Sequence, residues 1–122
     1  MKPLQILVVD DEQVICDACR LVLSERGHTV THCITGEEGL RELERSVYDL
    51  ILLDMKLPDI DGTRVLKFIA EKSVKTAVIV MTGYSTMSNA IEAMKLGAAD
   101  YLSKPFSEDE LLATIDSLFA GK

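Results

Sequence analysis

The sequence predicts one α/β domain in which five β-strands, each followed by an α-helix, form a parallel sheet. Three observations lead to this fold class. Short apolar runs alternate with stretches whose apolar residues recur at helical spacing. The first, third and fourth runs are apolar throughout, as strands covered on both faces of a sheet are. The length of 122 residues fits a single domain, spanning residues 1–122, that can bury a core without disulfides.

The first half of the chain contains three strands and two helices in this prediction. Residues 4–9 (LQILVV) form the first strand, and the helix after it has apolar residues at 14, 15, 18, 21 and 22 and ends at Gly27. A less apolar strand at 28–34 lies nearer an edge of the sheet. Thr35 caps the second helix, with Glu38 reaching back as in a capping box. The third strand spans residues 49–53 (DLILL).

The second half continues the alternation. The third helix runs from Gly62 to about Glu71, and residues 76–81 (TAVIVM) form the fourth strand. The fourth helix has apolar residues at 87, 90, 91 and 94 and is closed by Gly97, and a short fifth strand follows at 98–102. Ser107 and Glu110 form a second capping box at the start of the last helix. The pattern contains no internal repeat, linker or low-complexity tract.

Composition and charge exclude several classes of function. The 13 Lys and Arg residues against 20 Asp and Glu residues give a net charge of −7. An acidic domain repels phosphate backbones, so direct nucleic-acid binding is not expected. No apolar run is long enough to cross a membrane, and the acidic residues that follow the first short apolar run do not fit a signal peptide. We therefore expect a cytoplasmic protein that makes no membrane contact.

Cys16 and Cys19 form a C-x-x-C pair, which in other proteins serves redox chemistry or zinc binding. Here the pair falls inside a helical pattern, whereas a redox pair needs a helix N-terminus to stabilise its thiolate. The spacing to Cys33 and His32 matches no standard zinc module. The cysteines are therefore predicted to be small, partly buried structural residues.

Polar residues follow four of the five predicted strands. Asp10, Asp11 and Glu12 come after the first strand, Asp54 after the third, Thr82 and Gly83 after the fourth, and Ser103, Lys104 and Pro105 after the fifth. Ligands of open parallel sheets bind outside the carboxyl ends of the strands, where the strand order switches. Each of these residues alone could be an ordinary loop or cap residue. Together they place three carboxylates, a hydroxyl and an ammonium at one edge of the sheet.

This set of groups favours magnesium-dependent phosphate chemistry. Asp10, Asp11 and Asp54 would repel one another without a counterion, and Mg²⁺ typically takes one or two carboxylates while keeping several waters. A carboxylate can also attack phosphorus and form an aspartyl phosphate. Lys104 could neutralise one phosphoryl oxygen, and Thr82 could donate a hydrogen bond to another. Asp59 and Asp61 are assigned to the following loop, with Asp61 capping the third helix.

Four motifs give the chain a resemblance to the receiver domains of bacterial two-component response regulators. They are ILVVDDE, ILLDMKLPDIDG, VIVMTGY and ADYLSKPF, and the likeness covers essentially all 122 residues. The resemblance implies a flavodoxin-like, doubly wound sheet with strand order 2-1-3-4-5. It implies that Asp54 is the phosphoacceptor, that Asp11 binds Mg²⁺ directly, that Asp10 acts partly through water, and that Asp54 and the backbone carbonyl of Lys56 complete the metal site.

The same resemblance assigns the conformational switch. Thr82 and Lys104 are expected to contact the phosphoryl group, and the Lys104–Pro105 peptide bond, which the residues alone leave open, is expected to be cis. Tyr101 is expected to turn inward as Thr82 moves. The fourth helix, fifth strand and fifth helix, roughly residues 85–119, would relay the change. Lys56 and Tyr84 border the site and are candidates for tuning the lifetime of the phosphoryl group.

The resemblance also implies partners. A sensor histidine kinase would donate the phosphoryl group, and an effector domain in the same protein or a separate partner would respond, with a homodimer as a further possibility. The stretch from Ala90 to Phe106 is most similar to receivers of sigma-54-dependent transcriptional activators. In this interpretation the chain is no turnover enzyme; it assists its own phosphorylation and slow dephosphorylation.

Three other functions fit parts of the pattern. A Mg²⁺-dependent phosphohydrolase with an aspartyl nucleophile usually carries a second Asp two residues after the first, where this chain has Lys56. A flavin-binding module needs a hydroxyl- and glycine-rich loop where this chain has Asp10, Asp11 and Glu12. A phosphorylation-independent interaction module on the same scaffold would not need the full set of acidic residues with Thr82 and Lys104.

Overall fold

The predicted sheet is present, with all strands parallel and in the order β2-β1-β3-β4-β5. The computed structural model describes residues 2–72, 75–83 and 87–120, without the side chains of 87–89. The strands are β1 (Gln5–Val9), β2 (Thr29–Cys33), β3 (Leu50–Asp54), β4 (Ala77–Thr82) and β5 (Asp100–Ser103). The helices are α1 (Gln13–Glu25), α2 (Gly36–Arg45), α3 (Gly62–Glu71), α4 (Met87–Lys95) and α5 (Glu108–Phe119).

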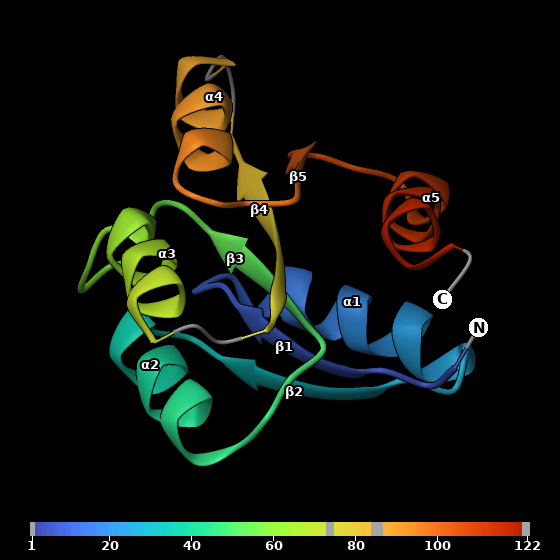
Figure 1. Cartoon of the computed structure of the whole chain (residues 1–122). Helices are drawn as coiled ribbons and strands as arrows, with labels where there is room; N and C mark the ends of the chain where they lie inside the picture. The colour runs from blue at the N-terminus through green and yellow to red at the C-terminus, as the bar shows by residue number, and fades with distance from the viewer. Residues whose placement is uncertain (1, 73–74, 84–86, 121–122) are drawn as a thin grey trace.

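The helices cover both faces of the sheet, as a doubly wound fold requires (Figure 1). On one face, α1 and α5 bury Cys19, Leu23 and Leu111 against Val8 and Leu52. The other face carries α2, α3 and α4, which contribute Leu40, Leu43, Val65, Ile69 and Ala93 to a second core with Ile51 and Leu53. Alternate residues of β3 therefore enter opposite cores, which explains why Leu50 to Leu53 are all fully buried.

Two strand boundaries differ from the sequence prediction in a way that matters for the site. The predicted third and fourth strands stop at Leu53 and Met81, but the observed strands include Asp54 and Thr82 as their last residues. The pairing continues because Asp54 lies opposite Met81 and Thr82 lies opposite Ser103. Both polar side chains are therefore held by strand backbone rather than by loops.

The predicted N-cap residues are confirmed, although Glu38 accepts a hydrogen bond from the Ile34 amide and does not complete a capping box with Thr35. Thr35 accepts a hydrogen bond from the Glu38 amide, Asp61 accepts one from Thr63, and Ser107 forms a complete capping box with Glu110. Gly27, after α1, has a φ of 88°, which residues with a Cβ atom rarely adopt. These local signals explain why the element boundaries follow the sequence closely.

The cysteines are structural, as their positions in the sequence predict. Cys16 and Cys19 lie within α1 and face the sheet, and Cys33 is buried at the end of β2. Burial raises the pKa of Cys16 to about 11 and that of Cys19 to about 12, so both thiols stay protonated and unreactive. None of the helices that the structure describes has both the length and the apolar character needed to cross a membrane.

Candidate functional site

The carboxyl ends of β1 and β3, neighbouring strands in the middle of the sheet, bring three acidic residues together. Asp10, Asp11 and Asp54 each offer a carboxylate oxygen, and these oxygens all lie within 4.8 Å of one another. Asp10 is fully buried, Asp54 is 6% exposed, and Asp11 is open to solvent. In the part of the chain that the structure describes, no other group of three or more acidic, His or Cys side chains could share a metal ion.

Asp10 is fixed by the start of the helix that follows it. Its backbone amide donates to the Cys33 carbonyl, which extends the pairing of β1 with β2 beyond Val9. Its Oδ1 accepts a hydrogen bond from the Glu12 amide at 2.9 Å, so the side chain closes the turn into α1. The N-cap of α1 is Glu12, which makes no side-chain cap of its own. The second oxygen of Asp10 is therefore left facing the acidic cluster.

Lys104 is the counterion of this cluster. Its Nζ lies 2.8 Å from Asp10 Oδ2, 3.0 Å from Glu12 Oε1 and 3.6 Å from Asp54 Oδ2. Burial of the ammonium acts to lower the pKa of Lys104, but the contacts with Asp10 and Glu12 and the charge of Asp54 outweigh it and hold the pKa above its usual value. One ammonium thus serves three carboxylates.

Asp54 remains a base that is ionised at neutral pH. Burial raises its pKa to about 6, and the charge of Asp10 adds to this, whereas the Lys56 amide and Lys104 act in the opposite direction. The Lys56 amide donates to Asp54 Oδ1 at 3.1 Å. One carboxylate oxygen is thus held by the backbone, and the other faces the lysine. A carboxylate with a raised pKa is a better nucleophile than an exposed one, provided that it stays ionised.

The chemistry of the donor set fits a hard divalent cation. Asp10 Oδ2 is buried, and the Lys104 ammonium, at 2.8 Å, is the group that offsets its charge. The triad of Asp10, Asp11 and Asp54 carries three carboxylates, and Lys104, which lies close to Asp10 and Asp54, supplies one positive charge, so negative charge is in excess. Oxygen ligands of this kind are what Mg²⁺ prefers. The acidic triad is therefore a candidate Mg²⁺ site.

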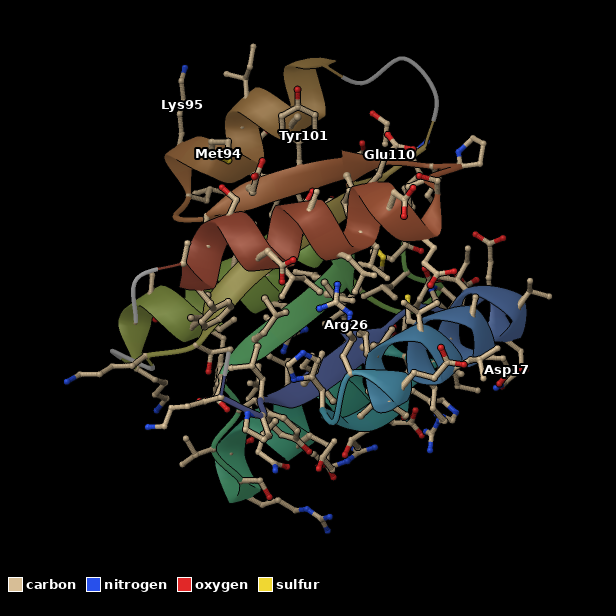
Figure 2. The ribbon with its side chains drawn as sticks, turned by 90° about the vertical axis from the view of Figure 1, so that its right-hand side faces the viewer. Asp17, Arg26, Met94, Lys95, Tyr101 and Glu110 are labelled. Carbon is tan, nitrogen blue, oxygen red and sulfur yellow. The ribbon has the colours of Figure 1, made fainter. Side chains whose placement is uncertain are left out.

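Thr82 and Tyr101, the two predicted switch residues, lie at the end of β4 and within β5. The Thr82 hydroxyl is buried and donates to the Leu102 carbonyl at 3.5 Å, toward β5. The Lys104 amide donates to the Thr82 carbonyl at 2.7 Å, and the Lys104–Pro105 bond is cis, as the resemblance implies. Tyr101 is 37% exposed and projects from β5 at the surface (Figure 2). Lys56 and Tyr84 were both expected to border the site. Lys56 is exposed, and Tyr84 lies outside the described residues.

Sequence reasoning missed two contacts of this site. Glu12 was assigned no role, yet its Oε1 lies 3.0 Å from Lys104 Nζ, nearer than Asp54 Oδ2. Its place in the run Asp10-Asp11-Glu12 is a signal that could have included it. Asp59 was assigned to the loop alone, but its carboxylate accepts hydrogen bonds from the amides of Gly36 and Glu37. No local signal could reveal that contact, because the partners are more than twenty residues apart.

Comparison with known proteins identifies the class of protein to which this fold and site belong. The family model of the response regulator receiver domain matches residues 6–116. The chain therefore belongs to the response regulator receiver domain family, the receiving component of two-component signalling.

Two transcriptional regulatory proteins are among the relatives of this chain. The chain is 39% identical over 112 residues to the transcriptional regulatory protein DltR of Streptococcus agalactiae, a match that covers 92% of this chain and 50% of DltR. It is 37% identical over 117 residues to the transcriptional regulatory protein ZraR of Escherichia coli, covering 96% of this chain and 26% of ZraR. The chain thus spans about half of one relative's length and about a quarter of the other's.

A solved structure agrees with these matches. The beryllofluoride-activated NtrC4 receiver domain dimer is 36% identical, with a TM-score of 0.88 over 94% of this chain and 95% of that one. ZraR and NtrC4 represent the sigma-54 activators, the group that the sequence resemblance indicated.

Proposed function

We propose that residues 1–122 form one receiver domain that acts as a phosphorylation-activated switch, in which Asp54 accepts a phosphoryl group from the phosphohistidine of a sensor histidine kinase. The observation that carries this proposal is the environment of Asp54. It is a buried, ionised carboxylate beside Asp10 and Asp11, with Lys104 Nζ at 3.6 Å. The family membership supports the same function, because its relatives are transcriptional regulators.

The transfer step follows from the groups present. An oxygen of Asp54 attacks phosphorus, the bond from phosphorus to the histidine nitrogen breaks, and the imidazole leaves with the electron pair of that bond. The product is an acyl phosphate on Asp54. A Mg²⁺ ion, when bound, neutralises charge on the phosphoryl oxygens. Asp10, Asp11, Asp54 and the backbone carbonyl of Lys56 are the proposed groups that would hold it.

Lys104 and Thr82 connect phosphorylation to a change of shape. The phosphoryl group brings new negative charge, so the Lys104 ammonium gains a partner that competes with Asp10 and Glu12. The Thr82 hydroxyl, which now donates to the Leu102 carbonyl, gains a stronger, charged acceptor. Both contacts exist only in the phosphorylated state, so they shift the equilibrium toward the conformation that forms them.

The proposed output face consists of α4, β5 and α5. Met94 and Lys95 of α4, Tyr101 of β5 and Glu110 of α5 project from the ribbon around this side (Figure 2). Ile91, Met94 and Tyr101 are large apolar side chains that remain 50%, 42% and 37% exposed. We propose that Tyr101 turns inward when Thr82 moves, and that the altered face binds an effector domain, a partner protein or a second copy of the chain. The similarity to a receiver that is a dimer when activated by beryllofluoride supports the last of these.

Acetyl phosphate and Mg²⁺ provide a direct test with a small donor. The expected product is one phosphoryl adduct per chain, observed as an intact mass, together with release of acetate. Because Asp10, Asp11 and Asp54 need a cation to accept an anionic donor, EDTA should prevent the adduct. Sustained release of inorganic phosphate from a phosphate ester, without an accumulated adduct, would contradict the proposal and favour a phosphohydrolase. The absence of any phosphoryl adduct in the presence of both acetyl phosphate and Mg²⁺ would contradict it as well.

A cytoplasmic location is part of the proposal, since the donor is the phosphorylated histidine of a kinase's signalling domain. Direct nucleic-acid and membrane binding are not assigned to this chain. Its net charge of −7 gives it an unfavourable field for polyanions.

A further inference from the structure

The loop between β3 and α3, residues 55–61, is attached to the N-terminus of α2. The Gly36 amide donates to Asp59 Oδ1 and the Glu37 amide to Asp59 Oδ2, each at 2.9 Å. These amides belong to the first turn of α2, where backbone donors lack partners within the helix. Desolvation acts to raise the pKa of the Asp59 carboxylate, but the backbone hydrogen bonds, those from Glu37 and Gly36 foremost, together outweigh it and hold the pKa below its usual value. The carboxylate is thus bound in its ionised form.

Close packing at the same place supports this attachment. A Cβ atom at position 36 would overlap with the side chain of Ile60, and it would lie 3.3 Å from Leu57 Cδ1. Glycine at position 36 therefore allows the loop to lie directly on the helix. The exposed ion pair of Arg64 and Glu37, at 3.5 Å, lies nearby and adds little. Apolar contact and two charge-assisted hydrogen bonds thus fix the outer end of the loop.

The inner end of the loop is fixed at the acidic site. The Lys56 amide donates to Asp54 Oδ1, and the Gly62 amide donates to the Met55 carbonyl at 3.1 Å. A Cβ atom at Gly62 would lie only 2.8 Å from the Met55 Cα atom, so the two segments are in close contact. Lys56 also pairs with Asp61 in an isolated bridge. The backbone of Lys56 therefore lies between an anchor at Asp54 and an anchor at Asp59.

We propose that Asp59 is a positioning residue for the metal site: by fastening the loop to α2, it holds the Lys56 backbone in place for the cation that the acidic triad binds. This inference rests on the proposed function, because it assumes that the Lys56 carbonyl is a ligand. Its physical basis is preorganisation. A loop that is ordered before the cation arrives loses less conformational freedom on binding than a mobile one.

An Asp59→Ala variant is expected to bind Mg²⁺ about 10-fold more weakly, the lower end of the effect of losing an outer-shell partner. Asp59→Asn keeps one acceptor, the amide oxygen, so its affinity for Mg²⁺ should lie between those of Asp59→Ala and the wild-type chain. The measurement is a Mg²⁺ titration followed by the amide NMR signals of the acidic site. Thr35→Ala is the matched control, because it removes an acceptor from the same end of α2, at the Glu38 amide, without touching the loop.

A second measurement needs no metal. Backbone ¹⁵N relaxation in EDTA should show Lys56 moving from the rigid range, an order parameter of about 0.85, toward values below about 0.6 in Asp59→Ala, but not in Thr35→Ala. Unchanged order at Lys56 in Asp59→Ala would overturn the inference. Equal weakening of Mg²⁺ binding by both variants would also overturn it, because general loosening of α2 would then be the cause. A wild-type chain without Mg²⁺ affinity would instead refute the proposed metal site, leaving relaxation to decide whether Asp59 orders the loop.

Discussion

An Asp54→Asn variant is expected to form no phosphoryl adduct and yet to be more stable than the wild-type chain in metal-free buffer at pH 7. Asparagine has nearly the same shape but no nucleophilic carboxylate, so the adduct is lost. The stability gain follows from the pKa of Asp54, which burial raises from 3.8 to about 6. A shift of this size corresponds to about 3 kcal/mol of unfavourable free energy when the group is ionised.

The pH dependence gives this prediction an internal control. The folded chain takes up the Asp54 proton near pH 6, whereas the unfolded chain takes it up only near pH 3.8. The cost of the ionised group is therefore fully present above pH 6 and disappears as the pH falls through this window. Chemical denaturation at pH 7.5 and pH 4.5 should show the advantage of the variant shrinking. The account would be contradicted if Asp54→Asn were less stable than the wild-type chain at pH 7.5, or if the difference in their unfolding free energies were the same at both pH values.

A Lys104→Met variant is expected to change stability in the opposite direction. Removal of the Lys104 ammonium leaves two carboxylates without their shared counterion: that of Asp10, which is fully buried, and that of Asp54. Breaking a buried ion pair from one side typically costs about 3 kcal/mol or more. Denaturation in EDTA measures this loss. Lys56→Met is the matched control, because it removes an exposed lysine beside the same site and should cost little.

The Lys104→Met variant should also bind Mg²⁺ about tenfold more tightly than the wild-type chain, because the cation no longer competes with an ammonium for the carboxylates. Mg²⁺ should therefore restore much of the lost stability. The phosphoryl adduct should still form, but it should no longer alter the environment of Tyr101, since one of the two groups that respond to the phosphoryl group is missing. Tyrosine NMR signals report that environment. Weaker Mg²⁺ binding by Lys104→Met would contradict the assignment of Lys104 as the resident counterion.

The fold could be predicted because its signals are local. The apolar run at Leu50–Leu53 and the caps at Thr35, Asp61 and Ser107 act over a few residues, and the observed elements follow them. The order of the sheet did not come from these signals; it came from the resemblance to a known family. The strand ends were displaced by one residue at Asp54 and Thr82, because the pairing of neighbouring strands, and not residue polarity, decides where a strand stops.

The site could be predicted only in part. The carboxylates of Asp10, Asp11 and Asp54 meet because the strands that carry them are neighbours, which follows from topology. The orientation of side chains does not follow from topology. Glu12 reaches Lys104, the Thr82 hydroxyl donates to the Leu102 carbonyl, and Asp59 binds the start of α2, each because of a contact between residues that are distant in the sequence.

The central claim is that Asp54 itself carries the phosphoryl group, and reductive trapping tests it most directly. Borohydride reduces an acyl phosphate to an alcohol, so a phosphorylated aspartate becomes homoserine. Trypsin should release residues 46–56 (SVYDLILLDMK), which contain both Asp49 and Asp54. After treatment with acetyl phosphate and Mg²⁺, fragmentation of this peptide should place homoserine at position 54 with Asp49 unchanged. Homoserine at Asp10, Asp11 or Asp49 instead, or at no position, would contradict the account.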